Sequence, residues 1–433
     1  MAKKSRKIKV EHSKSSRNVL FISYFFPPTA GGGVFRPLAM TRYLAKMGWN
    51  ITVLTATTPK HYPVDNELEK QIPGNVRVIQ RKVVWEGKLV RRSLGKAGLD
   101  WIPKHLITPD ERVFWADKAE KKASKLLKTE KFDLLYTTGP PFSINLCGVW
   151  LKRRFDIPWV VEFRDPWTLA PYLTIPNAHQ RRFAEDTESD FMEMADRVVM
   201  VTPTFTELMK EKYPEHAEKL VCITNGFDYE DFRGLGSRAN PGNSEFTIVA
   251  SGTVFGRNNM NDFLKALGII RKDHPDLFAR IRVFFQGLPD QRLNRKLLES
   301  GLNERCDSRG FRSHSDNIND LRNADLLLLP LAKVPNAHGH IPSRTYEYLA
   351  SGTPILAAAP DGDLKKLISN FPQVTCIDIK KPDEAVNAII QAFNNWKNGD
   401  DPPAVGAKLL HPLTRKAAAN EMSKLFAELT GAV

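Results

Sequence analysis

Residues 341–354 form the stretch that most constrains what this chain can fold into. Pro342 and Ser343 favour the start of a helix, because proline tolerates the first turn and serine can cap it. Gly352 suits the end of that helix, and the apolar run 354–359 predicts a short buried strand. The stretch therefore predicts a loop followed by a helix with free N–H groups in its first turn, which is an arrangement that binds anions.

Two side chains of this helix extend the prediction. Arg344, in the first turn, can make a bidentate phosphate contact. Glu347 lies one turn further on, where it can accept hydrogen bonds from sugar hydroxyls. A loop for phosphate and an acidic residue for ribose are what a nucleoside-diphosphate site requires. Spacing alone favours a plainer interpretation of Glu347, a solvated glutamate on a helix surface.

The composition is that of an ordinary globular protein. With 433 residues, of which 42% are hydrophobic, the chain is long enough for two or three domains with their own cores. The cysteines are isolated in the sequence, which predicts a reducing, cytoplasmic environment. No apolar run approaches the roughly 20 residues of a membrane span. The first apolar run of the chain, 19–26, is short and is followed by two prolines, so it predicts a strand rather than a secretory signal.

The net charge of +14 favours an anionic partner. We expect no nucleic acid, because no zinc spacing, RRM-type aromatic motif or other nucleic-acid module occurs. An anionic membrane surface or a diphosphate-bearing substrate fits the charge as well. The basic tail 3–17 suits a solubilising arm and peripheral attachment to the inner face of a membrane about equally. The basic, tryptophan-containing stretch 83–106 suits a packed insertion slightly better than a membrane-surface segment.

The first half of the chain begins with a Rossmann-like pattern. Its first elements are expected at 19–24 (strand), 34–47 (helix) and 51–55 (strand). Gly32 and Gly33 end the connecting loop and let the backbone approach a ligand at the helix N-terminus, although such a loop taken alone also suits a flexible turn. Arg36, in the first helical turn, can point into the same space.

Polar side chains end the apolar strand that begins at Trp159. Glu162, Arg164 and Asp165 are candidate site residues, because ligands of open α/β sheets bind at the carboxyl ends of strands. Glu162 and Arg164 alternate with apolar residues and therefore share a face. The alternative is an ion pair that braces the loop.

The second half of the chain repeats the pattern after a break. The polar, glycine-rich run 234–244 predicts a linker, and the apolar run 246–250 predicts the next strand. In the loop that follows, Gly252 allows close approach to a ligand, and Arg257 is well placed for a phosphate. A surface charge is the alternative for Arg257.

Two short patterns are similar to metal sites but suit different roles better. Asp361 and Asp363 form an Asp-x-Asp pattern, yet they follow a strand, and we expect them to cap a helix at 364–369. His338 and His340 have no third zinc ligand at a suitable spacing, so we expect a solvated or substrate-facing pair. We predict no metal ion and no cofactor.

The stretch around Glu347 resembles the C-terminal nucleotide-sugar motif of the retaining family 4 glycosyltransferases. The phrase Asn-Gly-Phe-Asp at 225–228 is similar to the one before their interdomain hinge, and Phe-Arg-Asp-Pro-Trp at 163–167 resembles members used in surface-polysaccharide assembly. The family usually carries two glutamates eight positions apart. Here Glu347 is the second, and Gly339 stands at the first position. Many members have histidine where this chain has Arg164.

The resemblance implies an α/β fold of two Rossmann-like domains that face each other across a cleft, the GT-B architecture. The expected divisions are a basic tail (1–17), an acceptor domain (18–233), a linker (234–244), a nucleotide-sugar domain (245–412) and a C-terminal helix that crosses back onto the N-terminal domain (413–433).

The resemblance also implies roles for the candidate residues. A nucleoside-diphosphate sugar would be bound by Gly32, Gly33, Gly252, Arg257, Ser343, Arg344 and Glu347. Asp165 would position the acceptor or take its proton, Arg164 would balance charge on acceptor or donor, and Glu162 is the third catalytic candidate. The acceptor or sugar side would include Arg36, His338 and His340, and the nucleobase would lie near Phe311 and Arg312.

The implied activity is sugar transfer with retention and without a metal, to a saccharide or lipid-linked saccharide acceptor in glycan biosynthesis. No carboxylate pair at a recognisable spacing supports a double displacement. One alternative is a nucleotide-sugar epimerase of the same fold. The other is a catalytically silent nucleotide-binding member, for which Gly339 is the main argument.

Overall fold

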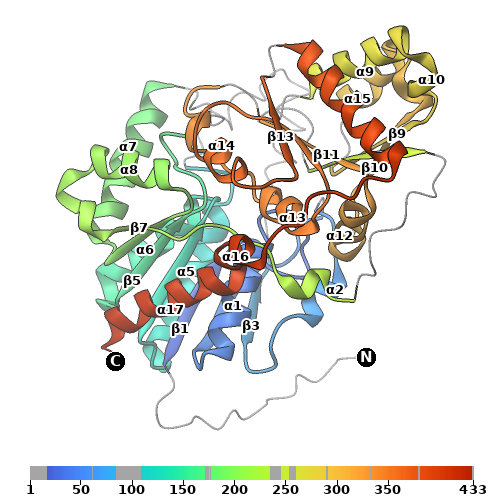
Figure 1. Cartoon of the computed structure of the whole chain (residues 1–433). Coiled ribbons are helices and arrows are strands. Elements are labelled where there is room, and N and C mark those ends of the chain that lie inside the picture. Colours follow the sequence, from blue (N-terminus) through green and yellow to red (C-terminus); the bar gives the residue numbers. More distant parts are fainter. Residues whose placement is uncertain are drawn as a thin grey trace.

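The chain folds into two α/β domains, each built on a parallel sheet (Figure 1). The structure is a computed structural model that describes residues 17–60, 62–83, 109–170, 175, 177–234, 245–252, 260–288, 291–331, 334–378 and 381–431. The prediction of two Rossmann-like domains is confirmed. Arg257, the stretch 84–106 and nearly all of both the basic tail and the expected linker lie outside the described residues.

The N-terminal domain has a seven-stranded sheet in the order β3-β2-β1-β4-β5-β6-β7. Strand β1, which lies between β2 and β4, is buried from Val19 to Ser23, which explains the continuous apolar run in its sequence. The elements are β1 (Asn18–Ser23), α1 (Phe35–Lys46), β2 (Asn50–Ala56), α2 (Asn66–Lys70), β3 (Arg77–Arg81), α5 (Val113–Thr129), β4 (Leu134–Gly139), α6 (Ser143–Phe155), β5 (Trp159–Phe163), α7 (Ala178–Met194), β6 (Arg197–Met200), α8 (Pro203–Lys212), η1 (Pro214–Lys219), β7 (Leu220–Cys222) and η2 (Tyr229–Phe232).

The C-terminal domain has a six-stranded sheet in the order β10-β9-β8-β11-β12-β13. Its strand β11 is buried along its whole length between two clusters of apolar side chains. The elements are β8 (Phe246–Ser251), α9 (Asn261–Asp273), α10 (Pro275–Phe278), β9 (Ile281–Gln286), α11 (Gln291–Glu299), η3 (Leu302–Glu304), β10 (Cys306–Gly310), α12 (His314–Asn323), β11 (Leu326–Pro330), η4 (Ala337–Gly339), α13 (Arg344–Ser351), β12 (Ile355–Ala358), α14 (Asp363–Ile368), β13 (Val374–Ile377), α15 (Pro382–Asn398), α16 (Ala407–Leu410), η5 (His411–Leu413) and α17 (Arg415–Thr430).

The last helix, α17, leaves the C-terminal domain and packs beside α1 of the N-terminal domain (Figure 1). Met422 and Phe426 join the apolar cluster that covers one face of the first sheet. The indole Nε1 of Trp49 donates to Ser423 Oγ at 2.8 Å, and its ring meets that of Phe426 edge to face. The predicted crossing of the C-terminal helix is therefore confirmed.

The two sheets present the carboxyl ends of their strands to each other. Residues that follow β2 and β6 in the first domain contact residues that follow β10 and β12 in the second, through the pairs Asp65–His314 and Thr204–Asp363. This arrangement places the predicted site residues of both domains along one interdomain boundary. None of the helices in the described ranges combines the length and the apolar character needed to cross a membrane.

Candidate active site between the domains

The glycine loop of the N-terminal domain is held by Arg164. Arg164 Nη1 donates to the carbonyl of Gly33 at 2.5 Å, Nε donates to that of Gly139 at 3.3 Å, and Nη2 donates to that of Pro140. Burial lowers the pKa of this arginine, although Glu162 and Asp165 oppose that effect. The guanidinium of Arg164 thus donates mainly to backbone carbonyls, and these bonds fix the positions of two loops.

Glu162 and Arg36 form a buried ion pair. Arg36 Nε lies 2.7 Å from Glu162 Oε2, and Thr138 Oγ1 donates to Oε1 at 2.7 Å. The remaining guanidinium nitrogens of Arg36 donate to the carbonyls of Thr224 and Ile223 at 2.6 and 2.8 Å. Glu162 is 0% exposed and Arg36 is 6% exposed.

This geometry corrects two expectations. Both carboxylate oxygens of Glu162 are occupied inside the fold, so the side chain does not reach a substrate as a catalytic group would. Arg36 points into the core rather than toward an acceptor. The bracing ion pair considered as an alternative exists, but Glu162 forms it with Arg36 instead of Arg164.

Asp165 is half-buried at the end of β5, in the loop that Glu188 anchors. Glu188, fully buried on α7, accepts from the backbone N–H of Thr168 at 3.0 Å and from its hydroxyl at 2.7 Å. Lys212 lies 2.7 Å from the same carboxylate, and Tyr213 donates to it at 3.1 Å. Burial and this carboxylate raise the pKa of Tyr213. Glu188 was not among the sequence candidates, because nothing in a helical sequence shows that a glutamate faces a distant loop.

The C-terminal domain contributes Arg344 at the start of α13. Gly252, at the end of β8, has a φ of +94°, and a Cβ atom there would lie 2.8 Å from Arg344 Nη1. Arg344 Nη2 donates to the carbonyl of Pro330, at the end of β11, at 3.3 Å. The positive φ at 252 favours glycine, and a side chain there would displace the arginine from its place across the strand ends. Ser343 makes no side-chain cap, so that detail of the predicted helix start is wrong.

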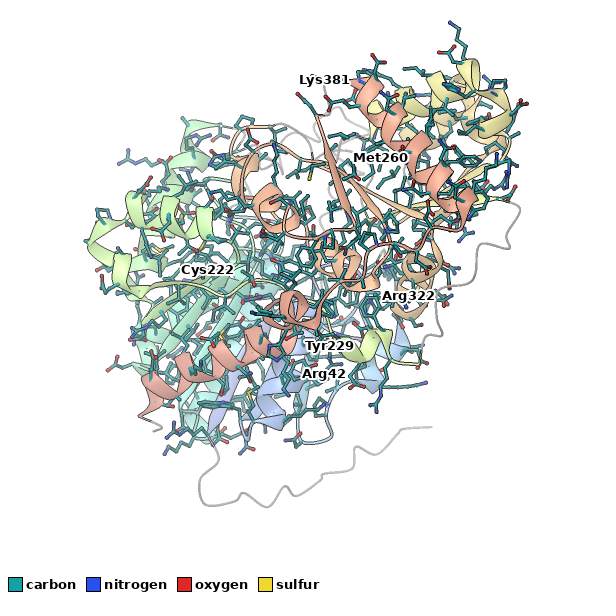
Figure 2. The ribbon with its side chains drawn as sticks, in the orientation of Figure 1. Arg42, Cys222, Tyr229, Met260, Arg322 and Lys381 are labelled. Atoms are coloured by element: carbon teal, nitrogen blue, oxygen red, sulfur yellow. The ribbon has the colours of Figure 1, made fainter. Side chains whose placement is uncertain are left out.

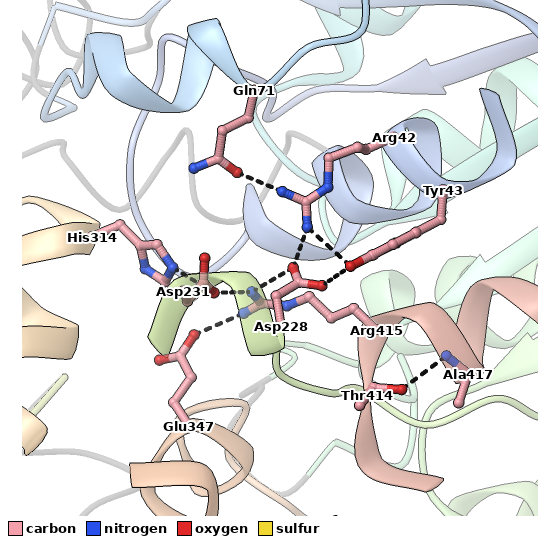
Figure 3. Close-up of polar contacts among 10 residues, drawn as sticks. All are labelled: Arg42, Tyr43, Gln71, Asp228, Asp231, His314, Glu347, Thr414, Arg415 and Ala417. Carbon is pink, nitrogen blue, oxygen red and sulfur yellow. Dashed lines mark hydrogen bonds and ion pairs between the residues drawn. The ribbon is translucent and has the colours of Figure 1, made fainter. Parts of the chain in front are cut away.

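Glu347, one turn further along α13, is paired with the first residue of α17. Arg415 Nη2 lies 2.7 Å from Glu347 Oε1, and both residues are buried (Figure 3). Arg415 Nη1 lies 3.3 Å from Asp228 and 3.1 Å from Asp231. Burial alone would lower the pKa of Arg415, but the three carboxylates outweigh it and raise the pKa. The prediction of a solvated glutamate, favoured by spacing alone, is wrong.

The same junction includes groups from both domains. Arg42 Nη2 lies 2.6 Å from Asp228, and Tyr43 donates to that carboxylate at 2.5 Å. Burial and this hydrogen bond raise the pKa of Tyr43 to about 12. His314 Nε2 lies 3.0 Å from Asp231, and its backbone N–H donates to Asp65 at 3.0 Å. Figure 2 labels Arg42 and Tyr229 beside this junction.

A second set of contacts joins the domains at α8. Thr204 donates through its backbone N–H and its hydroxyl to Asp363, at 2.9 and 2.7 Å. Asp363 therefore caps α8 of the other domain, whereas α14, which begins at Asp363, has no side-chain cap. The expectation that the Asp-x-Asp pattern caps 364–369 is wrong in this respect. The side-chain amide of Asn336 also crosses the boundary and donates to Leu169 O at 2.9 Å.

The remaining candidates lie at the edges of this boundary. Phe311 is 37% exposed, so its ring is available to a nucleobase. Arg312 Nε donates to Asp320 at 3.0 Å, so this arginine is already paired within the domain. His338 is exposed and His340 is half-buried. A Cβ atom at Gly32 would meet nothing within 4 Å. In the part of the chain that the structure describes, no three His, Cys, Asp or Glu side chains gather closely enough to hold a metal ion.

Comparisons with known proteins agree with this architecture. Residues 31–226 match the family model described as glycosyl transferase 4-like domain, and residues 237–403 match the model of glycosyl transferases group 1. Among curated protein sequences, none matches the chain.

Solved structures resemble the chain over nearly its whole length. Sucrose-phosphate synthase from Thermosynechococcus elongatus has a TM-score of 0.72 at 17% identity, with 96% of this chain and 100% of that chain covered. Anabaena HepE in complex with UDP-glucose has a TM-score of 0.63 at 14% identity, with 95% and 99% covered. A glycosyltransferase from Rickettsia africae has a TM-score of 0.61 at 14% identity, with 96% and 98% covered. At these identities the likeness establishes the fold.

Proposed function

Because the chain belongs to the group 1 glycosyltransferases of GT-B fold, we propose that it transfers a sugar from a nucleoside-diphosphate donor to a saccharide or lipid-linked saccharide, with retention. HepE, one of the similar structures, is in complex with UDP-glucose, which supports a nucleotide-sugar donor.

The observation that carries the proposal is the placement of Arg344 and Glu347 on one helix. Three residues apart on α13, they project from the same side of it. Arg344 lies across the carboxyl ends of β8 and β11 beside Gly252, where the phosphates would lie. Glu347 follows one turn later, where the ribose hydroxyls would lie. The order of the two side chains thus matches the order of groups in a nucleoside diphosphate.

The protein's contribution to the chemistry would be mainly electrostatic. When the bond between the sugar and the diphosphate breaks, negative charge develops on the leaving phosphate. Arg344 and the positive end of the α13 helix dipole would stabilise that charge, together with Arg257, whose role stays a prediction. These fixed positive groups would make a metal ion unnecessary, and addition of EDTA tests that point.

Retention follows in this proposal from attack on the face that the diphosphate leaves. Glu162 is already paired with Arg36 and offers no nucleophile for a double displacement. Asp165, at the end of β5, would take the proton of the acceptor hydroxyl or position it. Arg164 would act by holding the loops around the acceptor through Gly33 and Pro140.

A silent, nucleotide-binding role is the second candidate, and one observation favours it. Gly339 stands where related enzymes usually have a glutamate, and the ring of Phe205 fills the space beside it. The chain would then bind a nucleotide without turning it over.

Calorimetric titration with UDP, GDP, ADP and dTDP tests the donor site. We expect one of the four to bind, and Glu347→Ala and Arg344→Ala to weaken it at least tenfold, since each removes a charge-assisted contact. Glu421→Ala, an exposed glutamate on α17, is the matched control and should bind as the wild type does. Failure of all four nucleotides would overturn the proposal.

Product analysis separates the two candidates. Incubation of the bound nucleotide's sugar conjugates with saccharide acceptors should yield a glycoside whose anomeric configuration, read by NMR, equals that of the donor. Binding without product across a broad acceptor set would favour the silent role. Flotation with anionic and neutral vesicles tests peripheral membrane attachment, which the charge of +14 favours.

A further inference from the structure

Glu347 uses only one of its two carboxylate oxygens inside the protein. Oε1 lies 2.7 Å from Arg415 Nη2, and Oε2 has no hydrogen-bond partner among the described residues (Figure 3). Oε2 is not one of the fully buried side-chain atoms without a hydrogen-bond partner, so it remains in contact with solvent. A glutamate that is 6% exposed therefore still presents one oxygen for a ligand.

Arg415 is itself fixed from several directions. Its Nη1 lies close to Asp228 and Asp231, and its backbone N–H donates to the carbonyl of Phe227 at 2.8 Å. Thr414, just before it, caps α17 by accepting from the N–H of Ala417 at 3.1 Å. The guanidinium cannot swing away without breaking these contacts, so Nη2 stays directed at Glu347.

Such an anchor matters for recognition of a hydroxyl. A free glutamate side chain has rotamer freedom to lose when it accepts a hydrogen bond, and that loss weakens binding. A charge-assisted bond to Oε1 removes this freedom in advance and leaves Oε2 in one direction. The arginine need not touch the ligand to have this effect.

We propose that Arg415 is the positioning residue of the nucleoside subsite, which holds Glu347 so that Oε2 accepts a hydrogen bond from a ribose hydroxyl. The inference rests on the proposed function, because it takes a ribonucleoside diphosphate as the ligand. It makes the crossing helix α17 part of the donor site, although α17 packs on the other domain. Residues 347 and 415, which lie 68 positions apart, then act as one unit.

The test compares each ribonucleoside diphosphate with its 2′-deoxy and 3′-deoxy counterparts by calorimetry. The wild type should bind the ribonucleotide about tenfold more tightly than at least one deoxy counterpart, as expected for a lost hydrogen bond to a charged group. In Arg415→Gln that preference should fall to about one, as in Glu347→Gln. The double variant should show no further loss of preference, because the two residues are coupled.

Two further variants separate positioning from a structural role. Arg415→Lys keeps the positive charge, but a single ammonium group cannot contact both Glu347 and the two aspartates as the guanidinium does. This variant should therefore retain an intermediate preference for the ribonucleotide. Lys424→Gln, an exposed cation on the same helix, should keep the full preference. A structural role alone would weaken ribonucleotide and deoxynucleotide binding equally and leave their ratio unchanged.

The outcomes for the two proposals differ. If no nucleotide binds to the wild type, the proposed function fails and this inference fails with it. If the wild type prefers the ribonucleotide and Arg415→Gln keeps that preference, Arg415 does not position Glu347, while the donor site itself stands.

Discussion

The ring of Phe205, in the N-terminal domain, lies directly against Gly339, in the C-terminal domain. A Cβ atom at 339 would be 2.6 Å from Phe205 Cε1 and 2.7 Å from Cδ1, which is closer than side chains approach one another. The position at which the family resemblance leads one to expect a glutamate therefore has no room for any side chain. In place of the expected glutamate side chain, the Phe205 ring makes a contact between the two domains.

This contact predicts that Gly339→Ala destabilises the protein by about 1–3 kcal/mol, because the added methyl group overpacks the boundary. Phe205→Leu should relieve the strain, so that the double variant loses less than the sum of the single losses. Chemical denaturation measures both. Gly268→Ala on α9, where a Cβ atom would meet nothing within 4 Å, is the control and should be neutral or slightly stabilising. Equal losses at 268 and 339 would contradict the overpacking.

Asp363 offers a prediction with a control inside its own sequence pattern. Asp363→Ala removes the cap that Thr204 donates to, and should cost about 1 kcal/mol in unfolding free energy. It should also loosen the boundary between the domains, which small-angle scattering would register as an increase in radius of gyration. Asp361→Ala removes an exposed pair with Lys365 and should change neither quantity.

The buried pair of Arg36 and Glu162 predicts a loss of stability rather than a specific loss of chemistry. Glu162→Gln should cost about 3–5 kcal/mol, because the buried guanidinium loses its counter-charge. The exposed pair of Arg77 and Glu130 is the control, and Glu130→Gln should cost less than about 1 kcal/mol. A Glu162→Gln protein with unchanged stability and greatly reduced turnover would instead support the catalytic role first expected for this residue.

His314 predicts a dependence of stability on pH. Burial alone would lower its pKa, but Asp231 and Glu347 outweigh burial and Arg415, and the pKa lies above the ordinary value of 6.5. A raised pKa means that the folded protein binds the proton more tightly than the unfolded chain does. The stabilisation is therefore complete below pH 6.5 and is lost as the pH rises through the raised value.

Unfolding curves at several pH values check this prediction. His314→Gln should remove the loss of stability above pH 6.5, while the exposed His274→Gln should leave it in place. The facing group Asp231 does not obscure the effect, because its pKa lies below the ordinary value of 3.8 and it stays ionised throughout this range. A wild-type curve that is flat from pH 6 to 9 would contradict the assignment.

Much of the fold was accessible from local patterns. The apolar strands, the glycine loops and the helix after Pro342 were placed within a few residues, because each depends on side chains adjacent in sequence. The helices α7 and α8 were not predicted, and Glu188 and Phe205 were missed with them. Their polar faces gave no signal of the loop and the domain boundary that they contact.

The sequence by itself determined the two Rossmann-like halves and the family, since periodicity and short motifs encode these, and the family resemblance implied the crossing helix. It also placed Arg344 and Glu347 on one helix. Only the tertiary structure decided which charges meet. Glu162 pairs with Arg36, 126 positions away in the sequence, and Glu347 pairs with Arg415, 68 positions away. Buried charges must be paired, and the fold alone brings these partners within reach.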